Sequence, residues 1–259
     1  MENNEKNNIV PRNTSNPAFN PEFLADERVL DGEPMTVNGT INKTAISLFL
    51  VFIAATFSWG LAAKGFMDMV QALTVVSLIA AFVLGFVIIF KRTSPVIQYL
   101  VPVYALLEGT FLGTVSYMFE ASFPGIVQTA IKATLLCVAV MLILFRTGVI
   151  KVTEKLRAGV IMCTATVAGV YLIDLLLSLF GIRVPAINAA TPFGIGLSIL
   201  IVGIAAFNLL LDFDFIEEAS RRLMPKHIEW YGAFGLLVTI VWLYVELLKL
   251  LAKLQRSRR

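Results

Sequence analysis

The sequence predicts an all-α, polytopic membrane helical bundle with about seven transmembrane helices. Hydrophobic residues make up 58% of the 259-residue chain and charged residues only 15%, whereas roughly a quarter of the residues in a soluble domain are charged. Long uncharged stretches recur along the chain, each close to the roughly twenty residues that a helix needs to cross a bilayer. The alternation typical of a β-barrel is absent, so α-helices are the expected spanning elements.

Seven apolar segments are the candidate spans: 45–63, 73–90, 96–118, 126–145, 158–180, 193–211 and 233–251. Residues 1–40 are rich in Asn, Glu and Pro and lack periodicity, which predicts a disordered polar tail. We therefore expect a tail over 1–40 and a seven-helix transmembrane domain over 41–259. A doubled Asn-Pro-x-Phe pattern at 16–23 is either a peptide-docking motif or a pair of local turns.

Lys and Arg gather in alternate loops of this arrangement, after the second, fourth and sixth spans. By the positive-inside rule, these loops and the N-terminus lie in the cytoplasm. A basic C-terminus would then lie outside after seven crossings, so the sequence leaves open whether the last segment crosses or re-enters. The residues concerned are Lys91, Arg92, Arg146, Lys151, Lys155, Arg157, Arg221, Arg222 and Lys226 in the loops, and Lys253, Arg256, Arg258 and Arg259 at the C-terminus.

Two glycines of the third span, Gly109 and Gly113, are one helical turn apart. Small residues at this spacing allow two membrane helices to approach closely. We expect their face of the helix to be buried.

Ionisable residues inside membrane spans are costly and normally face the bundle interior, where they mark a function. Asp212 and Asp214 either line a cavity or end the sixth span at the interface. Glu246 lies deep in the last span, where it either serves a pathway or pairs locally with Lys249. The other candidates are Glu108 in the third span and Asp174 late in the fifth.

Several classes of function find no support in the sequence. His227 is the only histidine, and no nucleophile elbow, zinc-binding or phosphate-binding motif occurs. We therefore expect no enzymatic activity and no cofactor. The basic residues lie between apolar runs rather than in a stripe, so the expected partner is the lipid bilayer and not nucleic acid. Cys137 and Cys163 fall inside apolar runs, where a thiol packs as a small hydrophobe.

Three segments resemble motifs of the Bax inhibitor motif superfamily, also called the Bax inhibitor/YccA family. Leu211-Asp212-Phe213-Asp214-Phe215-Ile216 is similar to the family's Tyr-Asp-Thr-Gln-x-Ile signature at the end of the sixth helix. Leu243-Tyr244-Val245-Glu246-Leu247 resembles its Leu-Tyr-Leu-Asp-Phe motif in the seventh helix. Glu108-Gly109-Thr110-Phe111-Leu112-Gly113 is similar to its third-helix motif.

The resemblance implies seven helices with the last one central, and two hydrogen-bonded acids that sense pH and control a calcium leak. The matching positions are Asp212 and Glu246, and Lys91, followed by Arg92, is nearest to the family's latch arginine. The chain departs from the pattern in three places: Glu246 replaces Asp, Lys91 replaces Arg, and Asp214 replaces Gln. Lys cannot form the bidentate fork that Arg forms with a carboxylate.

These expectations lead to two functions from different classes. The first is a pH-sensitive cation leak channel of a bacterial inner membrane, with Ca²⁺ as the transported ion and the carboxylates of Asp212 and Glu246 as its hard oxygen ligands. The alternative is a non-transporting regulator that binds other membrane proteins, such as a protease or components of a stress or cell-death response.

Overall fold

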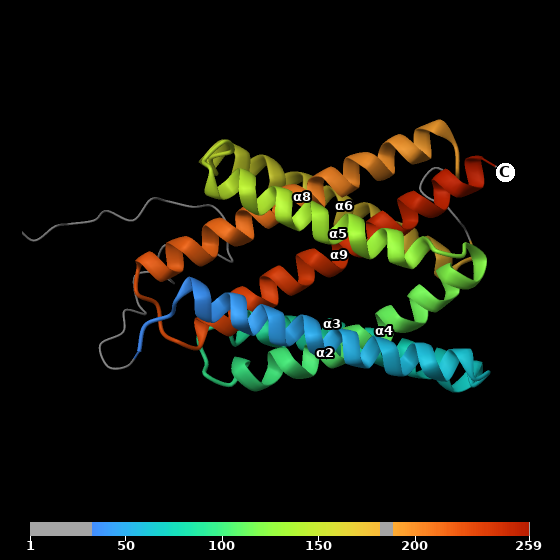
Figure 1. Ribbon diagram of the computed structural model, residues 1–259, viewed down its shortest axis with the longest axis horizontal. Coiled ribbons are helices and arrows are strands. Elements are labelled where there is room, and N and C mark those ends of the chain that lie inside the picture. The colour runs from blue at the N-terminus through green and yellow to red at the C-terminus, as the bar shows by residue number, and fades with distance from the viewer. Residues whose placement is uncertain (1–32, 182–188, 259) are drawn as a thin grey trace, which may run out of the picture.

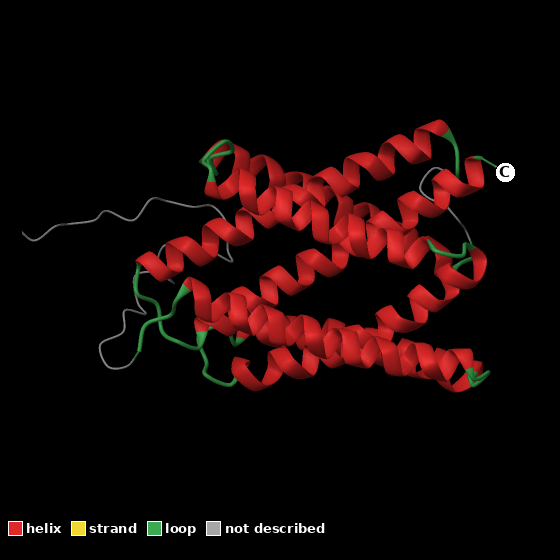
Figure 2. Ribbon diagram, in the orientation of Figure 1, coloured by secondary structure: helices red, strands yellow, loops and turns green. Residues whose placement is uncertain are grey.

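The computed structural model describes residues 33–181 and 189–258 and is helical almost throughout (Figure 2). Within these ranges, seven helices are long and apolar enough to cross a membrane, which confirms the predicted fold class. They are α2 (Val37–Ala63), α3 (Met67–Phe90), α4 (Ile97–Ser122), α5 (Ile126–Arg146), α6 (Glu154–Leu179), α8 (Pro192–Arg221) and α9 (Ile228–Ser257).

Helix α9 is the centre of the bundle. It packs against α2 and α4 on one side and against α5 and α8 on the other. Figure 1 shows the consequence, with α2, α3 and α4 below α9 and α5, α6 and α8 above it. Leu237, Leu243 and Leu248 of α9 are completely buried. The central last helix that the resemblance implied is therefore present.

Helices α2 and α4 make the most extensive contact in the bundle, and they approach closely at the two glycines of the third predicted span. A Cβ atom on Gly109 would lie 2.4 Å from the carbonyl oxygen of Val51, and one on Gly113 would lie 2.2 Å from that of Ala55. Both glycines are buried. Such an approach is open only to residues without a side chain, and the predicted burial of this face is confirmed.

The helices extend beyond the predicted apolar spans. Residues 37–40, which we expected in the tail, form the first turn of α2, and α8 continues past Leu211 to Arg221. Helix α9 is unbroken over 30 residues, about 45 Å at the helical rise, so the last segment has the geometry of a full crossing and no re-entrant turn. The Asn-Pro-x-Phe repeat at 16–23 lies outside the described residues.

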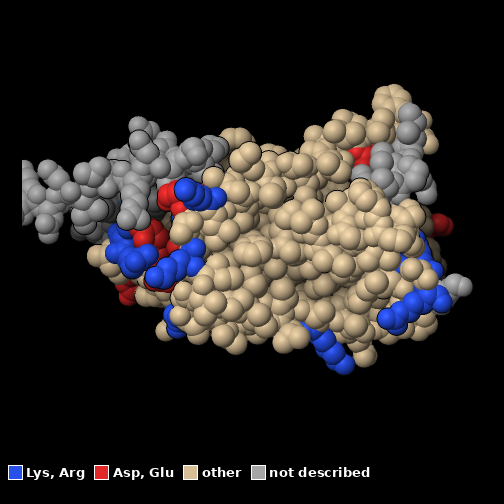
Figure 3. Space-filling view, turned by 90° about the horizontal axis from the view of Figure 1, so that it is seen from above, with Lys and Arg blue, Asp and Glu red and all other residues tan. Residues whose placement is uncertain are grey.

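The outer surface has the distribution that a bilayer requires. Large apolar side chains such as Phe52, Phe82 and Leu172 are more than half exposed on the outer faces of α2, α3 and α6. On the face shown in Figure 3, charged side chains gather mainly at the two ends of the molecule and leave a broad uncharged belt between them. We call one end the basic end, formed by the start of α2 and by loops 91–96, 147–153 and 222–227.

Candidate functional site

Asp212 lies within a continuous helix and not at its end. Since α8 runs on to Arg221, the carboxylate of Asp212 is about 14 Å from the end of the helix at the helical rise. It faces Gly235 and Thr239 of α9, and a Cβ atom on Gly235 would lie 3.4 Å from its Oδ1. Its Oδ2 is buried and accepts no hydrogen bond among the described residues. Asp212 therefore does not end the helix, but lies where α8 packs on α9.

Glu246 is buried on α9 and has two partners. The Tyr171 hydroxyl of α6 donates a hydrogen bond to its Oε2 at 2.8 Å, and the Lys249 ammonium lies 3.0 Å from its Oε1. Lys249 also lies over the Tyr171 ring, 4.4 Å from the ring centroid. The local pair with Lys249 and the contact with a second helix thus coexist.

The structure does not bring Asp212 and Glu246 together as a hydrogen-bonded pair. Asp212 faces Thr239, and Glu246 lies seven residues farther along α9, about 10 Å at the helical rise. Both oxygens of Glu246 have other partners, and no hydrogen bond or ion pair in the described ranges joins the two acids. Extending α8 through Ile216 does not place the carboxylates at the same depth, so the two acids are separate sites in this conformation.

The remaining predicted acids have different surroundings. Asp214 of α8 forms an ion pair with Arg157 of α6. Glu108 is partly buried beside Tyr104, one turn earlier on α4. Asp174 is partly buried on α6, near Tyr171. No hydrogen bond or ion pair within the described ranges joins any of these three to Asp212, so the candidates are distributed over several helices.

The latch position predicted at Lys91 falls on an exposed side chain that follows the end of α3. Its neighbour Arg92 is partly buried and lies near Tyr231 of α9, which is also near Asp212. Tyr231 is thus near both a guanidinium group and the Asp212 carboxylate. Of the two basic residues, Arg92 is therefore the one near the central helix.

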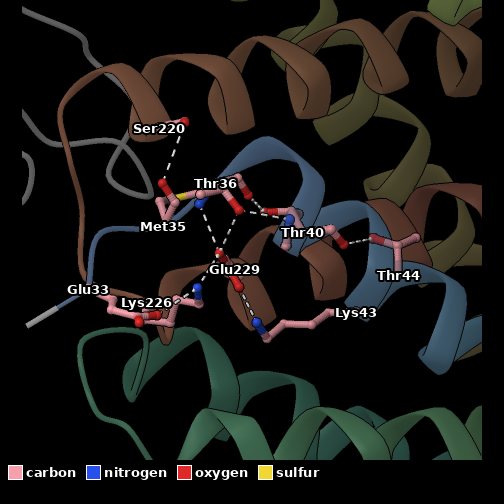
Figure 4. A network of polar contacts seen from close by, with 10 residues as sticks. Glu33, Met35, Thr36, Thr40, Lys43, Thr44, Ser220, Lys226 and Glu229 are labelled. Carbon is pink, nitrogen blue, oxygen red and sulfur yellow. Dashed lines mark hydrogen bonds and ion pairs between the residues drawn. The ribbon is translucent and has the colours of Figure 1, made fainter.

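A buried carboxylate at the basic end was missed by the sequence analysis. Glu229, in the first turn of α9, is fully buried and accepts hydrogen bonds from the backbone N–H of Thr36 at 2.8 Å and from its hydroxyl at 3.1 Å. It also forms an ion pair with Lys43 of α2. Figure 4 shows these groups converging on one side chain. This burial was hard to predict from the sequence, because Glu229 precedes the apolar part of its span.

The same network connects the α8–α9 loop to the start of α2. The backbone N–H of Met35 donates to the carbonyl of Met224 at 2.7 Å, and the Lys226 ammonium lies 3.2 Å from Glu33 and 3.8 Å from Glu229. These two carboxylates raise the pKa of Lys226. Burial lowers the pKa of His227, although a hydrogen bond with the backbone of Thr93 opposes that effect.

A second buried charge near the opposite end was also missed. The ammonium of Lys253 donates to the Ser198 hydroxyl at 2.7 Å and to the carbonyl of Gly194 at 3.1 Å. Lys253 shares a face of α9 with Thr239, Glu246 and Lys249. The central helix therefore carries buried polar groups along its length.

Within the described residues, no group of three or more His, Cys, Asp or Glu side chains could hold a metal ion.

Comparison with known proteins agrees with the fold. The family model described as Bax inhibitor 1 like matches residues 7–256. Neither the curated proteins nor the solved structures contain a match. Because the family match covers nearly the whole chain, including all seven membrane helices, this protein belongs to the Bax inhibitor 1-like family of integral membrane proteins.

Proposed function

We propose that this protein is a proton-controlled cation leak with Ca²⁺ as its transported ion and Asp212 as its principal titrating group. The observation that supports the proposal is the buried Oδ2 of Asp212, which has no hydrogen-bond partner in the described chain and lies where α8 packs on the central helix. A buried polar group without a partner needs an explanation, and a proton or a passing cation supplies one.

The direction of the pH effect follows from this packing. An ionised carboxylate with an oxygen that accepts no hydrogen bond is costly away from water, so the buried Oδ2 of Asp212 favours the protonated acid where α8 packs on α9. Raising the pH removes that proton and destabilises the contact. The packing of α8 on α9 that closes the pathway should therefore loosen, and the flux of calcium should increase with pH.

Glu246 has a different role in the proposal. Lys249 and Tyr171 already donate hydrogen bonds to its carboxylate, whereas Oδ2 of Asp212 has no such donor in the described chain. It offers a second set of hard oxygen ligands farther along α9. The two acids then act in series along one helix, which replaces the directly paired sensor expected from the sequence.

Calcium flux into liposomes that contain the purified protein and a calcium dye tests this proposal. We expect wild-type flux to be several times faster at pH 8 than at pH 6, and Asp212→Asn to bring that ratio close to one because the substituted amide does not titrate. Glu246→Gln should change the basal flux while a pH response remains.

Glu218→Gln is the matched control, since Glu218 pairs with Arg221 and Arg222 at a partly exposed position, and it should keep the wild-type response. A wild-type protein silent at every pH would contradict the proposal and favour the alternative of a non-transporting regulator that binds other membrane proteins. A pH response that survives in Asp212→Asn would remove Asp212 from its assigned role.

We further propose that the basic end faces the cytoplasm, because the loops between spans carry more Lys and Arg residues there than at the other end, where they carry only Lys64 and Arg183. In a background of Cys137→Ala and Cys163→Ala, Lys151→Cys should resist an impermeant maleimide in intact cells, and Lys64→Cys at the other end should react. Both side chains are exposed, so accessibility reports the side of the membrane. Rapid labelling of Lys151→Cys alone would reverse the orientation.

A further inference from the structure

Helix α6 is the least buried membrane helix of the bundle. Only Val160 is buried among its described side chains, and α8 is its main neighbour. A Cβ atom on Gly159 or Gly169 would meet nothing within 4 Å, so neither glycine brings the α6 backbone against another helix. Close apolar packing of the α2–α4 type is therefore absent here.

Three polar contacts connect α6 to the rest of the bundle instead, and they are spaced seven residues apart. Arg157 pairs with Asp214. Thr164 accepts a hydrogen bond from the Asn208 side-chain amide at 2.7 Å, and Tyr171 donates one to Glu246 at 2.8 Å. Residues seven apart lie on nearly the same helix face, with a drift of about 20°. We call these three α6 side chains the polar seam.

In a lipid bilayer, the polar contacts of this seam have a large effect on where α6 lies. Lipid tails are as apolar as leucine, so there is no hydrophobic drive for a lipid-exposed helix to join a bundle, and packing and interhelical hydrogen bonds determine its position. The packing of α6 is sparse. We propose that α6 is a detachable helix, held on α8 and α9 by the polar seam and able to leave them as a unit.

Detachment would alter two of the intramembrane acids at once. Asp214 would lose Arg157, and Glu246 would lose the Tyr171 hydroxyl and retain Lys249 on its own helix. No hydrogen bond or ion pair of the described chain joins α6 to Asp212, so detachment would remove no polar partner from that carboxylate. Through this connection the position of α6 would control access to Glu246 from the side of the bundle; this step rests on the proposed leak, whereas detachment itself does not.

The distance between spin labels on α6 and α5 tests detachment without any measurement of flux. Cys163 on α6 is exposed, and Leu136 on α5 is 66% exposed, so Cys163 and Leu136→Cys form the pair in a Cys137→Ala background. We expect Thr164→Val and Tyr171→Phe each to shift the ratio of docked to detached α6 about threefold, equivalent to the average of about 0.6 kcal/mol for an interhelical hydrogen bond in a membrane. The triple variant, with Arg157→Gln added to Thr164→Val and Tyr171→Phe, should shift this ratio more than tenfold. It should also show a second, longer distance between the labels on α5 and α6.

Thr166→Val is the matched control, because the Thr166 hydroxyl bonds only to the carbonyl of Met162 on its own helix. It should leave the distances unchanged. A second label pair, Phe57→Cys and Leu136→Cys with Cys163→Ala, should stay constant in every variant and show that the rest of the bundle is intact.

An unchanged α5–α6 distance in the triple variant would overturn the proposal, as would an equal effect of Thr166→Val. If the triple variant does not yield folded protein, the two hydroxyl-only variants decide, since they remove no charge. A longer distance in a protein that conducts no calcium would support detachment and contradict only the proposed leak.

Discussion

Gly113→Leu should be the most damaging single substitution in the membrane domain, with Gly109→Leu close behind it. Even a Cβ atom on Gly113 would lie 2.1 Å from the Ser58 hydroxyl oxygen and 2.2 Å from the Ala55 carbonyl oxygen. The obstacle is α2 backbone, which cannot rotate away as a flexible side chain can. We expect a loss of about 3 kcal/mol or more, at the upper end for overpacking, and a matching fall in melting temperature and yield in detergent.

Gly203→Leu on α8 is the control for this experiment. A Cβ atom there would meet nothing within 4 Å, and replacing a helical glycine by a better helix former is favourable by up to about 1 kcal/mol. Its melting temperature should equal or exceed that of the wild type. Wild-type stability of both Gly109→Leu and Gly113→Leu would show that α2 and α4 do not pack as described.

Glu229→Ala should have the second largest effect, because it removes the acceptor on which α2 and α9 converge. Breaking a buried charge pair by deleting one partner costs about 3–5 kcal/mol, and Lys43 would be left without its buried carboxylate. Since the Lys43 side chain keeps 17% exposure, we expect the lower part of that range. Hydrogen exchange at the Thr36 amide, which donates to Glu229, should accelerate together with the fall in melting temperature.

Two other variants show how much of this loss comes from the buried charge of Glu229. Glu229→Gln keeps an acceptor for Thr36 and removes only the charge, so its loss should be intermediate. Glu218→Ala removes a carboxylate whose partners are largely at the surface, where ion pairs contribute about 0–1 kcal/mol. Equal melting temperatures for Glu218→Ala and Glu229→Ala would contradict the structural importance assigned to Glu229.

The candidate site was only partly predictable from the sequence. The role of a polar group inside a membrane protein depends on which group lies next to it in the folded structure. The sequence placed Asp212 and Glu246 inside spans, but their depth depends on how α8 and α9 cross. It identified Lys249 as a local partner of Glu246, since residues three apart on a helix are neighbours. Tyr171 could not be foreseen as the other partner, because it lies on a different helix 75 residues earlier.

Glu229 and Lys253 illustrate the same limit at the two ends of α9. A hydropathy scan treats charges near span ends as interfacial, and most such charges reach water. Their burial follows from the start of α2 covering Glu229 and from Gly194 and Ser198 of α8 surrounding Lys253. These contacts exist only once distant segments are folded together.

The sequence by itself determined the fold class, the seven spans and the close-packing face at Gly109 and Gly113. These properties are local: length and apolarity decide whether a helix can cross, and a missing side chain decides how near a neighbour can come. The tertiary structure alone decided that Oδ2 of Asp212 has no hydrogen-bond partner in the described chain, that Glu246 has Tyr171, and that Arg157 and Thr164 of α6 bond to α8. The physical reason is that a buried polar group is stabilised by whichever group lies opposite it, and chain topology, not local pattern, determines that group.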